Sequence, residues 1–269
     1  MRFVFIAILF TVFISGNLYL QLLTSEFAQV LFCAFVTSFL IDWCIKRTSI
    51  RKIPIEYRSR MNADDICICI VRSVVSSGYA LADLYKNTIK STKKESDCGE
   101  VCSCKARFKG CFIRESNKWN LKFSCLVIIV LTIAESSSLD FTGNQAFKVL
   151  TYALILRVLS RSLEIIYAFT MDVIKGRKNN SSDLDKYDRI KLAINSYFES
   201  ILNFTAVYYV MNGGNVADSL FKSFATGTIS NVTIVGTNDQ LLSFFTTLQV
   251  VTSLSLVVLS LAIYVGREK

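Results

Sequence analysis

The segment Leu241–Val265 has the sequence LLSFFTTLQVVTSLSLVVLSLAIYV and decides the fold class of this chain. It carries no charged side chain, and it is longer than the ~20 mostly apolar residues with which an α-helix crosses a bilayer. We therefore expect an integral membrane protein, and we interpret the other segments around this span.

The rest of the sequence has a matching composition. Of its 269 residues, 52% are hydrophobic and only one is proline, and the apolar residues gather in long runs. The further predicted spans are Phe3–Leu23, Phe27–Ile45, Leu121–Ala134 with Ser136–Phe141, Tyr152–Ile174 and Leu192–Met211. We expect an all-α, polytopic membrane protein of about six transmembrane helices.

The first apolar run also has an alternative interpretation as a secretory signal peptide, because it follows Met1-Arg2. No small-x-small cleavage site follows the run, and the apolar pattern resumes at Phe27. A spanning helix is therefore the favoured interpretation of Phe3–Leu23.

Basic residues are concentrated in alternate connections between the predicted spans. Of the net charge of +9, most lies in Lys46–Lys122 and Gly176–Lys191, and the intervening connections contain only Lys222 as a basic residue. This positive-inside pattern predicts a multi-pass protein of the plasma membrane with both termini in the cytoplasm. The lipid bilayer is thus the expected partner of the basic residues, and nucleic acid is not.

The predicted organisation has five parts. They are a transmembrane hairpin (1–45), a basic, Cys-rich cytoplasmic insert (46–120), a second transmembrane pair (121–174), a cytoplasmic linker (175–191) and a pore-like unit (192–269). Within the insert, Ala63–Ile89 is predicted to be helical and Lys90–Lys118 to be a loop.

Four cysteines of the insert suggest a metal site. Cys98, Cys102, Cys104 and Cys111 could meet around a tetrahedral Zn²⁺. However, Cys102 and Cys104 are closer in sequence than most zinc-binding pairs, and the chain has no histidine. Reduced thiols are the favoured interpretation and zinc the alternative; no other cofactor is expected.

The sequence lacks the residues of the common catalytic sites. It has no histidine, no Gly-rich phosphate loop and no serine elbow. We therefore expect that the protein is not an enzyme.

The C-terminal part contains a moderately apolar segment, Ala217–Thr228, which is too short to cross a bilayer and lies between two predicted spans. Because irregular backbone at membrane depth must line a cavity or be buried in protein, a re-entrant pore helix is predicted. The closing helix carries a polar stripe, which could line water or bind a neighbouring helix; beside a re-entrant segment we favour pore lining. The stripe comprises Thr246, Gln249, Ser253, Ser260 and Tyr264.

Short motifs of this part follow a distinctive order. They are Asp188-Arg189-Ile190-Lys191, Tyr197-Phe198-Glu199, Tyr208-Tyr209, Leu220-Phe221-Lys222-Ser223, Leu248-Gln249 and Ile263-Tyr264-Val265-Gly266-Arg267-Glu268. With them, the stretch from about residue 186 to residue 269 resembles the two-helix pore domain of bacterial potassium channels. The resemblance implies a homotetramer, or assembly with a related channel subunit, that passes monovalent cations passively.

The resemblance places the filter at six residues, namely Thr228, Ile229, Ser230, Asn231, Val232 and Thr233. The family pattern, Thr-Val-Gly-Tyr-Gly, has two glycines that are absent here, and β-branched residues reach the required backbone angles only at a cost. Asn231 could adopt a left-handed conformation at one of the two positions; an alternative register uses Gly236. Weak or altered selectivity is therefore expected.

Two arginines lie near the middle of the predicted fourth span. Arg157 and Arg161 are four residues apart, and Glu164 follows one turn later. Voltage sensors carry a longer row of arginines with acidic partners on neighbouring helices, and the first three spans offer only Asp42. A buried structural Arg–Glu pair is favoured over a voltage sensor.

The sequence therefore predicts an ion-channel-like membrane protein for monovalent cations. The alternative is a non-conducting, channel-derived sensor or scaffold, in which the Cys-rich segment binds metal or responds to redox state.

Overall fold

The computed structural model describes residues 26–59, 61, 63–89, 101–137, 145–175, 183–212, 215–230 and 240–266. In these residues the chain forms eight α-helices, one short 3-10 helix (Ile55–Tyr57) and no strand. The all-α prediction is confirmed. The predicted span Phe3–Leu23 lies outside the described residues.

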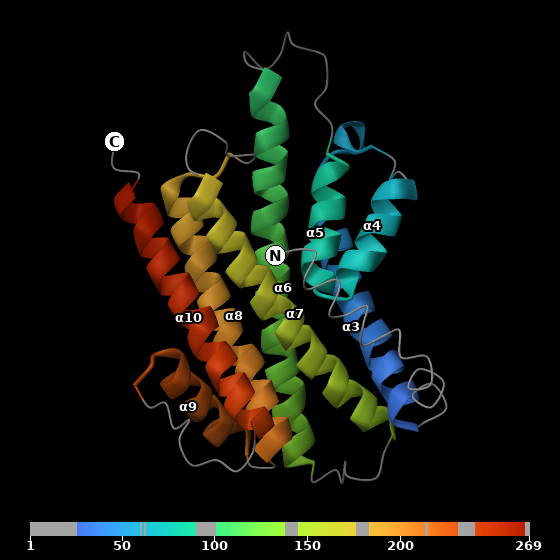
Figure 1. Cartoon of the computed structure of the whole chain (residues 1–269), viewed down its shortest axis with the longest axis vertical. Helices are drawn as coiled ribbons and strands as arrows, with labels where there is room; N and C mark the ends of the chain where they lie inside the picture. Colours follow the sequence, from blue (N-terminus) through green and yellow to red (C-terminus); the bar gives the residue numbers. More distant parts are fainter. Residues whose placement is uncertain are drawn as a thin grey trace.

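Five long helices form a bundle (Figure 1). In Figure 1, α3 (Glu26–Ile50), α7 (Gln145–Lys175) and α10 (Gln240–Gly266) run upward, whereas α6 (Val101–Ser136) and α8 (Lys186–Asn212) run downward. The N-terminal end of α6 and the C-terminal end of α10 therefore lie at one end of the bundle, which we call the insert end. The end at which α3 begins is called the far end.

Paired polar side chains align α6 with α8. Asn117 Nδ2 donates to Ser196 Oγ at 2.7 Å, and Ser124 Oγ donates to Asn203 Oδ1 at 2.8 Å. Both partners advance by seven residues, or two helical turns, so the two helices run in the same direction with the same faces in contact. These two hydrogen bonds, one buried and one partly buried, are of the kind that joins helices where the surroundings are apolar.

The predicted helical stretch Ala63–Ile89 forms two helices, α4 (Ala63–Ser73) and α5 (Ser77–Asn87). The break occurs where Ser76 takes an extended conformation, and its hydroxyl accepts a hydrogen bond from the Tyr79 backbone N–H as an N-cap. The two helices form a hairpin that packs through Leu81 and Leu84 against the side of α3.

The predicted loop Lys90–Lys118 is wrong from residue 101 onward, because α6 begins at Val101. The helix has an apolar face here that the abundance of polar residues concealed: Phe108 and Phe112 are four residues apart and contact Tyr57 and Tyr85. Burial of this face stabilises a helix that the local composition alone does not favour. α6 continues through residue 120, where the sequence places the end of the insert.

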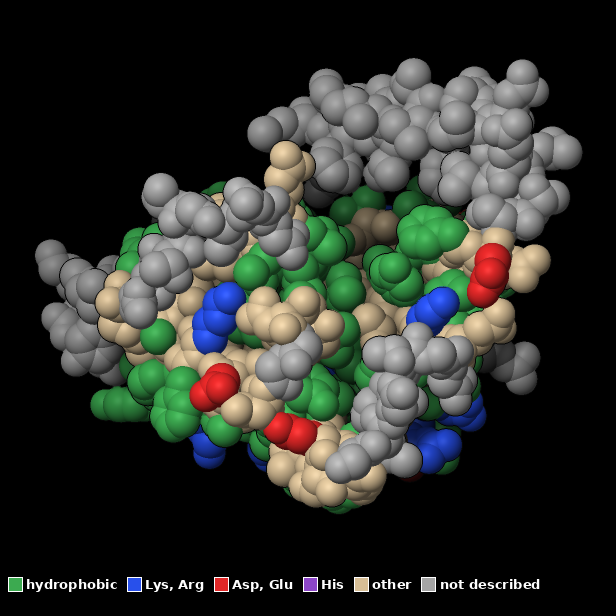
Figure 2. Space-filling view, turned by 90° about the horizontal axis from the view of Figure 1, so that it is seen from below, with side chains coloured by type: hydrophobic (Ala, Val, Ile, Leu, Met, Phe, Trp, Pro, Cys, Tyr) green, Lys and Arg blue, Asp and Glu red, His purple; other side chains and the backbone are tan. Residues whose placement is uncertain are grey.

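Three helices in the described part of the chain are long and apolar enough to cross a membrane. They are Glu26–Ile50, Lys105–Ser136 within α6 and Gln240–Leu259 within α10. The predicted spans Tyr152–Ile174 and Leu192–Met211 form α7 and α8, which are long but carry more charge. Seen from the far end, the described part of the bundle shows a few charged side chains among many apolar and uncharged ones (Figure 2).

Candidate functional site

The short helix α9 (Val216–Gly227) packs against α8, α10 and α6. It begins at the far end of the bundle, where Asn215 is its N-cap and accepts from the Asp218 backbone N–H at 2.6 Å. The Glu135 carboxylate, at the end of α6, accepts from the Val216 N–H at 3.1 Å. Two acceptors thus satisfy amides of the first turn and hold the start of α9 beside the end of α6.

The second half of α9 is fastened to α8 and α10 by buried hydrogen bonds. Ser223 Oγ donates to the Ile201 carbonyl at 2.7 Å, and Gln249 Nε2 donates to the Ser223 carbonyl at 2.8 Å. Tyr208 Oη donates to Gln249 Oε1 at 2.7 Å. Gln249, which is fully buried, therefore joins three helices with one side chain.

Helix α9 ends close to its neighbours. A Cβ on Gly227 would lie 3.4 Å from both Gln249 Nε2 and Ile201 Cγ1, which is van der Waals contact. Helix α9 therefore ends beside the middle of α8 and beside the first half of α10, and not at an end of the bundle (Figure 1).

The residues after α9 form a tight turn with a left-handed residue. Ile229 has φ of 59°, which a β-branched side chain adopts only at a cost of about 1–3 kcal/mol. The Thr228 and Ser230 hydroxyls are 2.9 Å apart, and both are exposed. Three of the six predicted filter residues thus form this turn; Asn231, Val232 and Thr233 lie outside the described residues.

The predicted polar stripe of α10 lies mainly between helices. Thr246, Gln249 and Ser253 are buried within the single chain, on the side of α10 that faces α8 and α9. Ser260 and Tyr264 lie in the last turns of α10. The hydrogen bonds of Gln249 agree with the helix-binding interpretation of this stripe, and pore lining stays a prediction.

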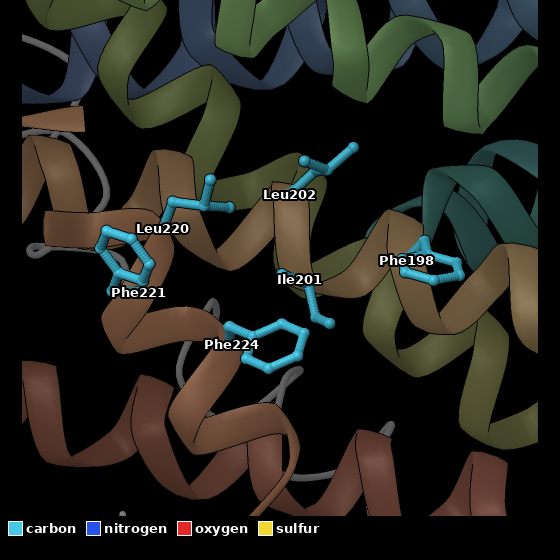
Figure 3. A pocket seen from close by; sticks show the side chains of 6 residues that line it. All are labelled: Phe198, Ile201, Leu202, Leu220, Phe221 and Phe224. Atoms are coloured by element: carbon cyan, nitrogen blue, oxygen red, sulfur yellow. The ribbon is translucent and has the colours of Figure 1, made fainter. Parts of the chain in front are cut away.

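An apolar groove of about 350 Å³ separates the outer faces of α8 and α9. Figure 3 shows its walls: Phe198, Ile201 and Leu202 come from α8, and Leu220, Phe221 and Phe224 come from α9. None of the described residues that line the groove is polar, and several of their aromatic rings lie at the surface of the single chain.

A second feature is a buried charge cluster between α3, α7 and α8, and its first member is Arg157. This α7 side chain is 1% exposed and pairs with Asp42 on α3. Arg157 Nη2 also donates to Asn120 Oδ1 on α6 at 2.9 Å, and its guanidinium lies 4.4 Å from the centre of the Phe123 ring. One arginine thus holds α3, α6 and α7 together.

The cluster continues toward the insert end as a chain of ion pairs. Lys46 Nζ on α3 lies 2.7 Å from Glu164 Oε1, and Glu164 Oε2 lies 2.9 Å from Arg161 Nη1 on α7. Arg161 also holds Glu199 on α8, with Nε–Oε1 and Nη2–Oε2 distances of 2.7 and 2.8 Å. The predicted Arg161–Glu164 pair is thus one link between α3 and α8.

The start of α5 lies against this cluster. Ser77 Oγ donates to Asp42 Oδ2 at 2.6 Å, and the Gly78 backbone N–H donates to Ser160 Oγ at 3.2 Å. A Cβ on Gly78 would lie 2.5 Å from Glu164 Oε2, so any larger residue here would displace the Glu164 carboxylate. The positive end of the α5 dipole therefore faces two carboxylates.

The cluster balances three carboxylates against three cations. Glu164 and Glu199 are paired with Lys46 and Arg161, and Asp42 is paired with Arg157. Sequence reasoning missed Lys46 and Glu199. A signal for Glu199 was present, because it is the only charged residue in Leu192–Met211, and a lone charge in an apolar run requires a partner.

The structure describes only part of the predicted zinc site. Cys102 and Cys104 lie in the first turns of α6, Cys111 lies farther along the same helix, and Cys98 lies outside the described residues. Among the described residues, no group of three or more His, Cys, Asp or Glu side chains could hold a metal ion.

Comparison of the chain with protein-family models, with curated proteins and with solved structures gives no match.

Proposed function

We propose that the chain is a multi-pass membrane protein in which α8, α9 and α10 form one quarter of a passive pore for monovalent cations. The observation that carries the proposal is the position of the end of α9, which lies beside the middle of α8 and beside the first half of α10, two helices of 27 residues each.

The depth of this end follows from helix geometry. At a rise of 1.5 Å per residue, Ile201 lies about 16 Å from the end of α8 at Asn212, and Gln249 lies about 14 Å from the start of α10 at Gln240. Half the thickness of a bilayer core is about 15 Å. A bilayer spanned by α8 and α10 would therefore place Gly227 near its middle.

A chain that turns at this depth needs polar surroundings. Backbone N–H and C=O groups without helical partners are tolerated at membrane depth only inside protein or beside water. The exposed hydroxyls of Thr228 and Ser230, and the strained backbone of Ile229, lie at this turn. Several copies around an axis would enclose these groups, which supports the tetramer implied by the resemblance to potassium channels.

The ion chemistry of such a constriction follows from its residues. Hydroxyl and carbonyl oxygens replace part of the hydration shell of a monovalent cation. Without the two glycines of the family pattern, the backbone does not easily stack four rings of carbonyls. The proposed pore therefore passes K⁺ and Na⁺ with modest discrimination.

The test is planar-bilayer recording of the purified protein under a KCl/NaCl gradient. The Ser230→Cys variant should conduct, and a cationic thiosulfonate reagent should block it because the label would obstruct the constriction. The control is Val257→Cys on the exposed apolar face of α10, which the same reagent should leave conducting. A current that is blocked equally in both variants would contradict the assignment of residue 230 to the constriction.

A second candidate is the non-conducting scaffold. It is favoured by one observation: the buried Gln249 of α10 forms hydrogen bonds with α8 and α9 within the chain and so stabilises their packing. A folded, membrane-inserted protein that gives no current in either ion, alone or with a related channel subunit, would support the scaffold and overturn the pore.

A further inference from the structure

Helix α4 has an apolar face that no other described element covers. Ile66 and Ile70 are exposed in one row of the helix and Val71 in the next, and the exposed residues Val74 and Val75 follow in the turn after α4. On the opposite face, Cys69 and Ser73 are buried toward α5. The helix is thus amphipathic, with its polar and small side chains inside the protein and its large apolar ones outside.

The turn between α4 and α5 lies deep beside the bundle. Ser76 Oγ donates to the Ser160 carbonyl on α7 at 3.0 Å, and Ser77 Oγ donates to Asp42 on α3. Val74 and Val75 immediately precede these two serines. The turn is therefore held at the level of Asp42 by buried hydrogen bonds.

This level can be placed along α3. Glu26, at the start of α3, accepts a hydrogen bond from Gln145 Nε2 at the start of α7, so the two helices begin at one level. Asp42 lies sixteen residues farther, or about 24 Å at the helical rise. Because a bilayer core is about 30 Å thick, a membrane that begins near Glu26 still surrounds Asp42.

The neighbouring surface of α3 is also exposed and apolar. Val36 and Leu40 are exposed and apolar, and Leu40 is only two residues from Asp42. Acyl chains that cover Leu40 therefore reach the depth of Val74 and Val75. The charged end of α4, with Asp64 and Asp65 in the first turn, points away from this depth. Arg72 pairs with Asp83 of α5 and can extend its charged group toward the headgroups.

We propose that α4 and α5 form a membrane-dipping hairpin, whose turn enters the cytoplasmic leaflet and whose α4 stripe contacts lipid acyl chains. The hairpin enters and leaves on the same side, since α3 and α6 both have their connected ends there (Figure 1). The inference rests on membrane insertion of α3, and it does not depend on ion conduction.

The experiment is spin-label accessibility in liposomes of phosphatidylcholine and phosphatidylglycerol. Nitroxides are attached to single cysteines in a cysteine-free chain, at Val74→Cys, Ile70→Cys and Ile66→Cys. The lipid-facing reference is Leu40→Cys, and the water-facing reference is Asn87→Cys at the exposed end of α5. Collisions with oxygen, which concentrates in lipid, are compared with collisions with a water-soluble nickel chelate.

The expected result is an oxygen-to-nickel ratio at residues 74 and 70 several-fold higher than at residue 87 and close to that at residue 40, with a lower ratio at residue 66. An oxygen-to-nickel ratio at residue 74 equal to that at residue 87 would mean that residue 74 faces water, and would overturn the proposal. Low collision rates with both probes at residue 74 would mean that protein covers the stripe, and would overturn it too.

If the cysteine-free chain does not fold, Val74→Trp in the otherwise native chain replaces the spin label. The Val74→Phe variant contains only the native Trp43 and Trp119, and its quenching by brominated lipids is the baseline. The Val74→Trp variant should lose a larger fraction of its fluorescence than this baseline. Equal quenching of the two variants would count against the proposal. A reference residue 40 that is itself accessible to nickel would instead show that α3 does not span, and would contradict the proposed function as well.

Discussion

The Arg161 guanidinium on α7 grips the Glu199 carboxylate on α8 with two parallel hydrogen bonds, and Glu199 is completely buried. This pair connects the charge cluster of α3 and α7 with the unit formed by α8, α9 and α10. The guanidinium and the carboxylate have a fixed bidentate geometry. A movement of α7 relative to α8 must therefore either break the two hydrogen bonds or move both side chains together.

The first prediction is an asymmetry between the two members of this pair. Arg161→Met leaves the buried Glu199 with no cation in the described part of the chain, so the free energy of unfolding should fall by about 3–5 kcal/mol. Glu199→Gln should cost less, because Arg161 keeps Glu164. The measurement is unfolding in mixed micelles by titration with SDS.

The double variant Arg161→Met with Glu199→Gln is the decisive control, since it removes both charges and leaves Lys46 paired with Glu164. It should be more stable than Arg161→Met alone. If the decrease in the free energy of unfolding of the double variant equals the sum of the decreases of the two single variants, the pair does not couple α7 to α8.

The second prediction concerns the contact between α5 and the cluster. Gly78→Ala puts a methyl group 2.5 Å from Glu164 Oε2, so it should lower the free energy of unfolding by about 1–3 kcal/mol. Gly227→Ala is the matched control, because its methyl group meets only van der Waals contacts; it should be neutral or stabilise by about 0.5–1 kcal/mol. Equal effects of the two changes would contradict the close approach of α5 to α7.

The third prediction tests the fastening of α9. Gln249→Leu removes the hydrogen bonds of Gln249 with the Tyr208 hydroxyl and the Ser223 carbonyl, and should cost about 1–2 kcal/mol. Thr247→Ala, at an exposed position of the same helix, should stay within about 0.5 kcal/mol of the native value. The same SDS titration measures both, and a neutral Gln249→Leu variant would speak against the three-helix junction.

The fourth prediction distinguishes two thiols of α4. Cys67 is exposed and Cys69 is buried, and burial raises the pKa of the Cys69 thiol. A raised pKa leaves less thiolate at neutral pH, so N-ethylmaleimide should label Cys67 before Cys69 in mild detergent. Tandem mass spectrometry of the peptide assigns the label, and SDS should make both thiols react. Faster labelling of Cys69 in the folded protein would mean that α4 has the opposite face toward α5.

The fifth prediction concerns selectivity. The native pore should not strongly prefer K⁺ over Na⁺, whereas the triple change Asn231→Gly, Val232→Tyr and Thr233→Gly should shift the reversal potential toward that of K⁺. Gly236→Ala is the control for the alternative register and should leave selectivity unchanged. Strong K⁺ selectivity of the native protein, or an altered selectivity in Gly236→Ala, would refute the register.

Much of the helical content follows from local sequence. The runs Phe27–Ile45 and Leu241–Val265 lie within α3 and α10 as expected, because a continuous apolar stretch can satisfy its backbone only through its own helical hydrogen bonds. The failure at Lys90–Lys118 has the opposite origin. There the polar and basic residues dominate the local pattern, and the helix is stabilised by Phe108 and Phe112 packing on partners that are distant in sequence.

The sequence by itself determined most of the helices and indicated that Arg157 and Arg161 would need partners. Only the tertiary structure decided their partners on other helices: Asp42 for Arg157, and Glu199 for Arg161. The physical reason is that helical hydrogen bonds and apolar character are properties of a single segment. Ion pairing instead depends on which faces of α3, α7 and α8 meet, and packing over the whole bundle selects those faces.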